Sequence, residues 1–288
     1  MDIESKKFLG QPKNFVSIFN ALLFDGKQVL KPEYLKDENS ELVMNVSSKH
    51  VDIIKRYEDG TYLDLFVIES QSYVDQCMVA RVMEYESVAR MRYIRQNFKK
   101  HVPMHTRLPM ILTVVLYVGE SKWNAAKRLS ELEIIHPGFE DMFNEFKLNL
   151  IELNTNHKYN TGEKATQDFF DLLRMIYRKQ ILKEDLDREF NRDALYFAYV
   201  VTKNKELLNI YQKSEKGDVK VCRALDEMFE ESTNKGIQMG IKQGIEQGIA
   251  LNQFEVYQTM LDKGFSVKAI ASIFSVSEES IKTLLMRT

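Results

Sequence analysis

Hydrophobic runs between positions 50 and 71 give the clearest structural signal in the chain. Both runs are rich in Val, Ile, Leu, Phe and Tyr, and an Asp-Gly pair at 59–60 separates them. Such a pair between two hydrophobic runs is typical of a β-hairpin with a two-residue loop. Counting back along the ladder from that loop places Asp52 opposite Val67. The pattern therefore predicts two antiparallel strands in this register.

Helical spacing of apolar residues appears on both sides of this hairpin. One helix is predicted to start at Pro12 and to end at Asp25-Gly26. A second, long helix is predicted to run to about Phe98, with Asp75 as its N-cap, because an Asp before an apolar run supplies the missing acceptor. A short run at 41–46 predicts one further strand.

A continuous apolar run follows at 109–118 and ends at Gly119, which is typical of a strand buried on both faces. Trp123 is expected to pack in the core. From Glu184 to Phe229 the pattern predicts mostly helix and indicates no chemistry.

Glycines then recur every four residues from Gly236 to Gly248, each followed by an isoleucine. Each glycine costs about 0.8 to 1 kcal/mol relative to Ala in a helix, so an isolated helix here would be marginal. The same spacing keeps a narrow Gly/Ile stripe that another helix could approach closely. The segment 231–252 is therefore either a flexible linker or a helix for self-association.

The segment 253–288 predicts a small helical unit. It contains a helix at 266–274 and a third helix capped by Ser277, and the pair resembles a helix-turn-helix. The third helix begins with two glutamates, which phosphates would repel. The unit is therefore either a DNA reader or a helical cap or dimer contact.

Composition indicates a globular protein that can bury a core, with 288 residues of which 44% are hydrophobic and 28% charged. No run of eighteen apolar residues occurs, and the first ten residues lack an apolar signal segment. We expect a cytoplasmic protein that does not enter a membrane. Cys77 and Cys222 are far apart, without a Cys/His cluster at zinc spacing, and are expected to be reduced thiols.

The formal net charge is −2, so any binding of nucleic acid has to depend on a local basic patch or on a bound metal. The segment 87–119 contains six basic residues and no acidic residue. This patch suits contacts with phosphates, although such a run is also typical of a solvated helix face. The six residues are Arg90, Arg92, Arg95, Lys99, Lys100 and Arg107.

Polar side chains interrupt the hydrophobic hairpin. In the predicted register Asp52, Glu69 and Gln71 share one face, and the Cβ atoms of the two acids lie within about 8 Å. One divalent cation can take an oxygen from each carboxylate, and it would offset the cost of several kcal/mol of burying them. Alternatively, this face of the sheet lies in water. The pattern alone leaves both open.

Asp52 followed by Ile68-Glu69-Ser70-Gln71 resembles the Asp...Glu-x-Lys signature of the PD-(D/E)XK nuclease superfamily. Within it, longer blocks resemble the recombination-promoting nuclease and putative transposase family. The blocks stand in the family's order: NALLFDGKQVLKPEYL at 20–35, VDIIK at 51–55, IESQSYVDQCMVARVMEYESVAR at 68–90 and LPMILTVVLYVGESKWNAAKRLSEL at 108–132.

The resemblance implies an α/β protein with a restriction-endonuclease-like αβββαβ core at 1–160 and a helical C-terminal extension. The extension would comprise helices at 161–230, the repeat at 231–252 and the small unit at 253–288. It also implies a DNA endonuclease with a role in DNA recombination or in mobile elements.

By resemblance, Asp52 and Glu69 hold Mg²⁺, or Mn²⁺ in its place, together with the backbone carbonyl of Ser70. Gln71 is the third catalytic residue. Side chains of the following helix are expected to contact DNA: Arg81 and Tyr85, which lie on one turn, and Arg90, Arg92 and Arg95.

The chain departs from the superfamily at Gln71, where the signature has lysine. An amide can orient a water by hydrogen bonds but cannot offset negative charge. Lys49 or Lys55 could supply that charge. Two alternatives to an active nuclease remain: a nuclease-fold protein without catalysis that binds DNA or a partner, and a homo-oligomeric regulator that works through its C-terminal helices.

Overall fold

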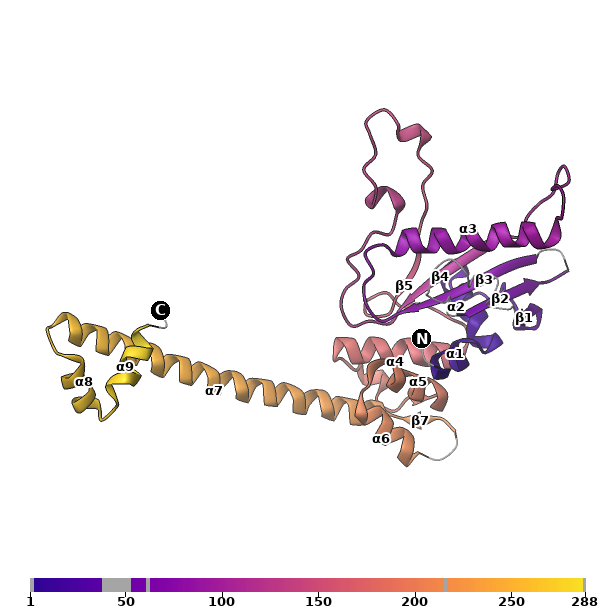
Figure 1. Cartoon of the computed structure of the whole chain (residues 1–288). Coiled ribbons are helices and arrows are strands. Elements are labelled where there is room, and N and C mark those ends of the chain that lie inside the picture. Colours follow the sequence, from indigo (N-terminus) through magenta and orange to yellow (C-terminus); the bar gives the residue numbers. More distant parts are fainter. Residues whose placement is uncertain (1–2, 38–52, 61–62, 215–216, 287–288) are drawn as a thin grey trace. The chain divides into compact units, whose positions relative to one another are not determined.

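The computed structural model of the chain (Figure 1) describes residues 3–37, 53–60, 63–214 and 217–286. Contacts divide the chain into two compact units, Met1–Asp226 and Glu227–Thr288, each with its own hydrophobic core. The strand predicted at 41–46 lies outside the described residues, and so do Lys49 and Asp52.

A five-stranded mixed sheet forms the centre of the first unit. Its first three strands are antiparallel, and the third, fourth and fifth are parallel. A helix, α3 (Met78–Asn97), joins the third strand to the fourth and lets them run parallel. The strands lie in the order β1 (Leu35–Asp37), β2 (Ile53–Glu58), β3 (Leu63–Gln71), β4 (Ile111–Tyr117) and β5 (Asn149–Glu152).

The described elements α2 (Pro12–Phe24), β1, β2, β3, α3 and β4 follow one another in the order helix, three strands, helix and strand. β1 is not the strand predicted at 41–46, so the predicted αβββαβ core itself stays a prediction. α2 ends where the sequence predicted, with Asp25 in the left-handed conformation at φ 51° and Gly26 at φ 79°. The mixed α/β character and the helical C-terminal region are therefore confirmed, with β5 as an additional strand.

The predicted hairpin is present, but its loop and register were wrong. Val67 pairs with Ile54 and not with Asp52, because β2 ends at Glu58 and β3 begins at Leu63. A two-residue type I′ turn needs positive φ at both central residues, whereas only Gly60 (φ 88°) adopts it and Asp59 does not. The register shifts by two residues, so the assignment of side chains to faces is unchanged.

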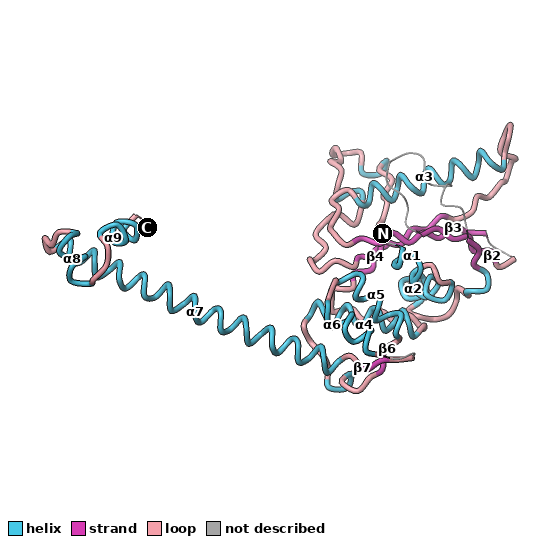
Figure 2. The backbone as a smooth tube through the Cα atoms, turned by 60° about the horizontal axis from the view of Figure 1, so that its bottom comes forward, coloured by secondary structure: helices cyan, strands magenta, loops and turns pink. Residues whose placement is uncertain are grey.

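Helices cover both faces of the sheet (Figure 2). On one face, Tyr85 and Ala89 of α3 form a buried cluster with Ile54, Leu65 and Val67. On the opposite face, the aromatic residues of α2 pack on β2 and β3: Phe19 stacks on Phe66 with ring centroids 4.8 Å apart, and Tyr57 lies 5.6 Å from Phe66. Each strand therefore contributes alternate side chains to two separate cores.

A helical layer packs against α2 on the side away from the sheet. Phe8 contacts Phe197 at 4.7 Å, and the Ser17 hydroxyl donates to Thr166 Oγ1 at 2.8 Å. The layer consists of α1 (Ile3–Leu9), α4 (Lys164–Arg178), α5 (Arg192–Thr202) and α6 (Lys205–Lys213), with a small sheet of β6 (Glu189–Phe190) and β7 (Val219–Lys220). Short 3-10 turns lie at Pro32–Tyr34, Leu129–Glu131, Glu140–Met142 and Lys183–Asp185.

The Gly/Ile repeat lies within one continuous helix, α7 (Cys222–Asp262), so the flexible-linker interpretation was wrong. In the second unit, Tyr257 of α7 packs with Ile270 of α8 (Val267–Phe274) and Ile281 of α9 (Glu278–Leu285). Ser277 caps α9 as predicted, since its hydroxyl accepts from Ser280 N at 3.1 Å.

Among the helices that the structure describes, we find none with the length and apolar character needed to cross a bilayer. Both cysteines are free thiols, Cys77 exposed and Cys222 buried.

Candidate functional site

Three predicted site residues, Glu69, Ser70 and Gln71, form the carboxyl end of β3. Glu69 and Gln71 are 3% and 5% exposed. They are two residues apart and share one face of the sheet, as the sequence predicted. This is the face that α3 covers. The Gln71 side chain donates from Nε2 to Glu69 Oε1 at 2.9 Å. The structure thus brings the predicted carboxylate and amide together in a buried position.

Arg81 joins this pair from α3. Its Nη2 atom lies 3.3 Å from the same Glu69 oxygen, Oε1, that accepts from Gln71. The Arg81 side chain is 17% exposed. One carboxylate oxygen therefore accepts from a neutral amide and from a guanidinium at the same time.

Asp75 and Tyr85 hold the Arg81 guanidinium in place. Nη1 donates to Asp75 Oδ2 at 2.5 Å, and Nε and Nη2 donate to the Tyr85 hydroxyl at 3.1 and 2.8 Å. Asp75 was predicted as the N-cap of this helix. Instead, the helix begins at Met78, Cys77 is the N-cap residue, and Asp75 Oδ1 accepts from Cys77 N at 2.9 Å.

The electrostatics keep this arginine charged. Burial opposes its charge, but the hydrogen bonds to Tyr85 and Asp75 and the charge of Glu69 outweigh burial and raise the pKa of Arg81. Burial raises the pKa of the Tyr85 phenol, against the hydrogen bond from Arg81, so Tyr85 remains protonated at neutral pH. The cluster therefore consists of one fixed cation, two carboxylates and a neutral phenol.

The other predicted DNA-binding residues lie farther along α3. Arg90 forms an ion pair with the buried Glu86 at 3.3 Å, and its side chain is 41% exposed. Arg92 is half-buried and Arg95 is exposed. At about 1.5 Å per residue, Arg95 lies roughly 21 Å along the helix from Arg81. The five predicted residues therefore share one helix but not one site.

Lys55 cannot supply the charge that Gln71 lacks, and that prediction was wrong. Its Nζ atom lies 2.6 Å from Asp37 Oδ1 and 5.9 Å from the Phe15 ring centroid. These contacts place Lys55 on the α2 face of the sheet, whereas Glu69 lies on the α3 face.

Donor atoms suited to a divalent cation occur beside Glu69. Val118 N donates to Gln71 O at 2.8 Å, so the Gln71 carbonyl faces β4 and the preceding Ser70 carbonyl faces the β2 side. Ile53 pairs with Ile68 there, and Asp52 directly precedes Ile53 in the sequence. Within the described residues no group of three His, Cys, Asp or Glu could hold a metal. Of the predicted ligand set, Glu69 and Ser70 are described and Asp52 lies outside the described residues.

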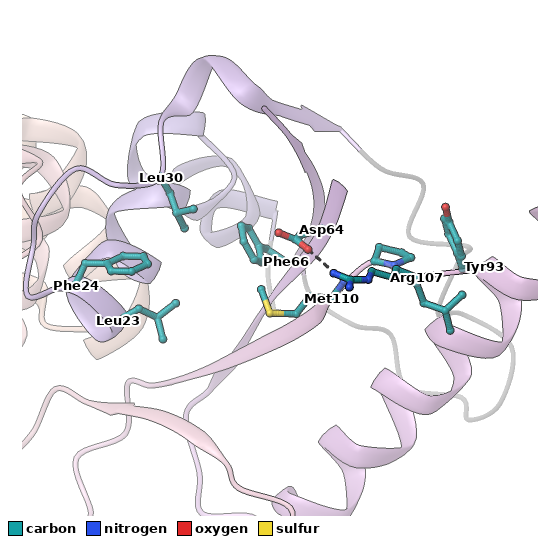
Figure 3. A pocket seen from close by; sticks show the side chains of 10 residues that line it. Leu23, Phe24, Leu30, Asp64, Phe66, Tyr93, Arg107 and Met110 are labelled. Atoms are coloured by element: carbon teal, nitrogen blue, oxygen red, sulfur yellow. Dashed lines mark hydrogen bonds between the residues drawn. The ribbon is translucent and has the colours of Figure 1, made fainter. Parts of the chain in front are cut away.

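A separate cavity of about 680 Å³ lies at the other end of β3 (Figure 3). Its charged residues are Asp64 and Arg107, and Asp64 Oδ1 accepts from Met110 N at 3.1 Å. Burial raises the pKa of Asp64. At about 3.3 Å per residue, Asp64 is roughly 16 Å from Glu69 along the strand. The other lining residues are Leu23, Phe24, Leu30, Phe66, Tyr93, Leu108, Pro109 and Met110.

Sequence reasoning missed this cavity because its walls come from segments far apart in the chain. It also missed the contact between Asp75 and Arg81.

Comparison with known proteins identifies one family. The family model described as "Putative transposase, YhgA-like" matches residues 6–207, which include the whole five-stranded sheet and the Glu69 cluster. Neither the search of curated proteins nor the search of solved structures found a match. The restriction-endonuclease-like core therefore stays a prediction.

Proposed function

Because the chain belongs to the family described as "Putative transposase, YhgA-like", the family that its sequence blocks predicted, we propose that it is a metal-dependent DNA endonuclease. The observation that supports this most is the Glu69 cluster. A carboxylate that is 3% exposed stands at the end of a central strand, beside an amide and a fixed cation. Buried charges placed in this way are more common at functional sites than elsewhere.

Asp52, Glu69 and the Ser70 carbonyl would hold Mg²⁺, or Mn²⁺ in its place. Hard cations of this kind prefer oxygen ligands and keep several waters. When bound, such a cation supplies Lewis-acid stabilisation of the phosphate charge and eases deprotonation of the attacking water.

The protein's own residues would position the reactants. Gln71 donates to Glu69 through Nε2, which leaves its amide oxygen to accept a hydrogen bond from water. The oxygen of that water would bond to phosphorus while the water gives up one proton to solvent. The P–O ester bond to the leaving group would break, and the leaving oxygen would take one proton from solvent. The described chain thus supplies orientation and charge for a hydrolysis that needs no other reactant than water.

DNA is the proposed substrate, and the basic side chains of α3 and of the segment after it would contact its backbone. Arg92 is half-buried, and Arg95, Lys99, Lys100 and Arg107 are exposed. Arg90 remains 41% exposed in its pair with Glu86. Together they would bring phosphates to the side of the sheet where Glu69 lies.

Plasmid nicking in Mg²⁺ tests the proposal. Glu69→Gln and Asp52→Asn are expected to lower the nicking rate by about a hundredfold or more, because each replaces a negatively charged carboxylate ligand of the metal with a neutral amide. Glu86→Gln is the matched control, since Glu86 is also a buried carboxylate beside an arginine of α3. Glu86→Gln should nick at the wild-type rate. Equal nicking by all four proteins would contradict the proposal.

One observation favours a second function. Arg81 already neutralises Glu69, so the buried carboxylate is stable in the fold without a metal. A nuclease-fold protein without catalysis would keep this pair and bind DNA or a partner. A chain that binds DNA but nicks it in neither Mg²⁺ nor Mn²⁺ would establish this alternative.

The partner in that case would be a second copy of the chain, bound through α7. Its isoleucines at 237, 241, 245 and 249 are each more than half exposed, and a Cβ added at Gly240 or Gly244 would meet nothing within 4 Å. This open apolar stripe could pack closely against the same stripe of another helix.

A further inference from the structure

Among the described contacts of Glu69, the positive charge comes from Arg81 of the helix α3. Gln71 stands where the superfamily signature has lysine, and an amide carries no charge. Lys55 lies on the other face of the sheet. Arg81 reaches Glu69 Oε1 at 3.3 Å, the same oxygen to which Gln71 donates at 2.9 Å. The Arg81 guanidinium and the side chain of residue 71 therefore contact the same carboxylate oxygen, so Arg81 places its positive charge beside position 71.

We propose that Arg81 supplies the positive charge that lysine supplies in Glu-x-Lys nucleases, and that Tyr85 and Asp75 position it. This inference rests on the proposed function. Arg81 would face the phosphate and stabilise the negative charge that develops on its oxygens as water attacks.

The contacts of Arg81 suit this role. Its five N–H donors form a rigid fork, and three of its nitrogens are engaged by Glu69, Asp75 and Tyr85. A long side chain that is already immobilised loses little further conformational freedom when substrate arrives. The charge is therefore preorganised, which is the property that makes electrostatic stabilisation effective.

The spacing of the residues on α3 explains how the helix delivers this charge. Arg81 and Tyr85 are four residues apart and face the same way, so the Tyr85 hydroxyl can hold the guanidinium from the next turn. Asp75 precedes the helix and holds the guanidinium from the other side. Tyr85 is itself fixed, because its ring lies in the buried cluster between α3 and the sheet.

A purely structural role for Arg81 and the proposed role predict opposite changes in metal affinity when Arg81 is removed. If Arg81 only satisfies a buried carboxylate, removing it should lower stability and weaken the metal site. If it is a separate charge beside a metal site, removing it relieves repulsion of the incoming cation. Metal affinity then rises while the reaction slows, and these two changes have opposite signs.

The test compares Arg81→Gln, Arg81→Lys and the double variant Gln71→Lys/Arg81→Gln with the wild type. Nicking in Mg²⁺, the affinity for Mn²⁺ alone by calorimetry and the melting temperature are measured for each. The matched control is Arg174→Gln. Arg174 is 14% exposed and ion-paired to Asp171, so it resembles Arg81 in burial and pairing.

Arg81→Gln is expected to nick about a hundredfold more slowly, while Mn²⁺ binds about tenfold more tightly. Arg81→Lys should retain more activity than Arg81→Gln. The double variant should recover at least tenfold of the lost rate, because it returns the charge to position 71. Arg174→Gln should change only the melting temperature.

Tyr85→Phe tests the positioning role without a change in charge. It should slow nicking by about tenfold and leave Mn²⁺ affinity unchanged. The variant Tyr85→Phe/Arg81→Gln should be no slower than Arg81→Gln alone, because residues that act through one another are not additive.

Two results would overturn the inference. One is wild-type nicking by Arg81→Gln; the other is weaker Mn²⁺ binding by Arg81→Gln together with no recovery in the double variant. If Arg81→Gln does not fold, Arg81→Lys and the double variant decide, since each keeps one positive charge. Nicking in either within tenfold of the wild type supports the role, and loss in both contradicts it.

Failure of the inference is distinguishable from failure of the proposed function. A wild-type protein that neither nicks DNA nor binds Mn²⁺ removes the function and the inference together. A wild-type protein whose activity depends on Glu69 but not on Arg81 removes the inference alone.

Discussion

Two buried glutamates of the first unit have different partners, and the partners decide what each can do. Glu86 Oε1 accepts from the backbone of Thr113 at 3.0 Å, just before the point where Val114 begins to pair with Asn149 of β5. Glu86 therefore completes a strand edge. Glu69 instead accepts from the side chains of Gln71 and Arg81, which can exchange partners without breaking a strand.

The pH dependence of stability should report the burial of Glu86. Burial raises its pKa in the folded state above the ordinary value, so the folded protein holds more protons than the unfolded chain between the two pKa values. Stability should therefore fall as pH rises through that interval. Glu86→Gln has no such group, and urea unfolding from pH 4 to 7 should show a flatter profile for it. A steeper profile for Glu86→Gln would contradict this assignment.

The two thiols should differ in reactivity. Burial raises the pKa of Cys222 to about 12, and Cys222 is fully buried, whereas Cys77 is exposed. Only the thiolate reacts, so iodoacetamide at pH 8 should label Cys77 in the folded protein and both thiols in urea. Mass spectrometry that finds Cys222 labelled as fast as Cys77 in the folded protein would disprove the burial of Cys222.

At the scale of residues, periodicity predicted which side chains share a face. The period of two placed Glu69 with Gln71, and the spacing of four placed Arg81 with Tyr85, and both pairs form contacts. Periodicity did not predict that the second pair meets the first. That contact depends on how α3 lies over the sheet, which is set by the packing of Tyr85 and Ala89 and not by any local pattern.

At the scale of elements, the sequence predicted the helices better than the hairpin loop. α2, β4 and α9 lie close to their predicted positions because Pro12, Gly119 and Ser277 mark their ends. The two-residue loop predicted from the Asp-Gly pair was wrong, because that turn requires a left-handed conformation at Asp59. The chain uses a longer connection between β2 and β3 instead.

Substitution of glycines in α7 tests whether this helix meets a second copy. Gly240→Ala and Gly244→Ala should each stabilise a lone helix by about 0.8 to 1 kcal/mol. If the Gly/Ile stripe packs against another helix, the added methyl groups hold the two helices apart. We expect sedimentation equilibrium to show weaker self-association in the double variant. A higher melting temperature with an unchanged molecular mass would contradict self-association through this stripe.

At the scale of the whole molecule, the net charge is too small to attract DNA, so binding depends on where the charges lie. The formal charge is −2, yet the segment 87–119 carries no acidic residue. The sequence predicted this patch but not the different surroundings of its residues: Arg90 is held in an ion pair, whereas Arg95 is exposed at the far end of α3.

Salt dependence measures this patch directly. DNA affinity of the wild type should fall with a log–log slope of about one per phosphate neutralised. Arg95→Gln/Lys99→Gln should lower the slope by up to about two, because both residues are exposed. Lys13→Gln is the control, since Lys13 is exposed on α2 at the other face of the sheet. An equal effect of the control and the double variant would mean that DNA binds elsewhere.

Calorimetric titration of the full chain with Mn²⁺ tests the central claim most directly, because it asks whether Glu69 belongs to a metal site at all. We predict one Mn²⁺ per chain, with an affinity that falls by at least about tenfold in Glu69→Gln and in Asp52→Asn and stays unchanged in Glu86→Gln. Binding of equal strength in the wild type and in both site variants, or no binding to the wild type, would contradict the account.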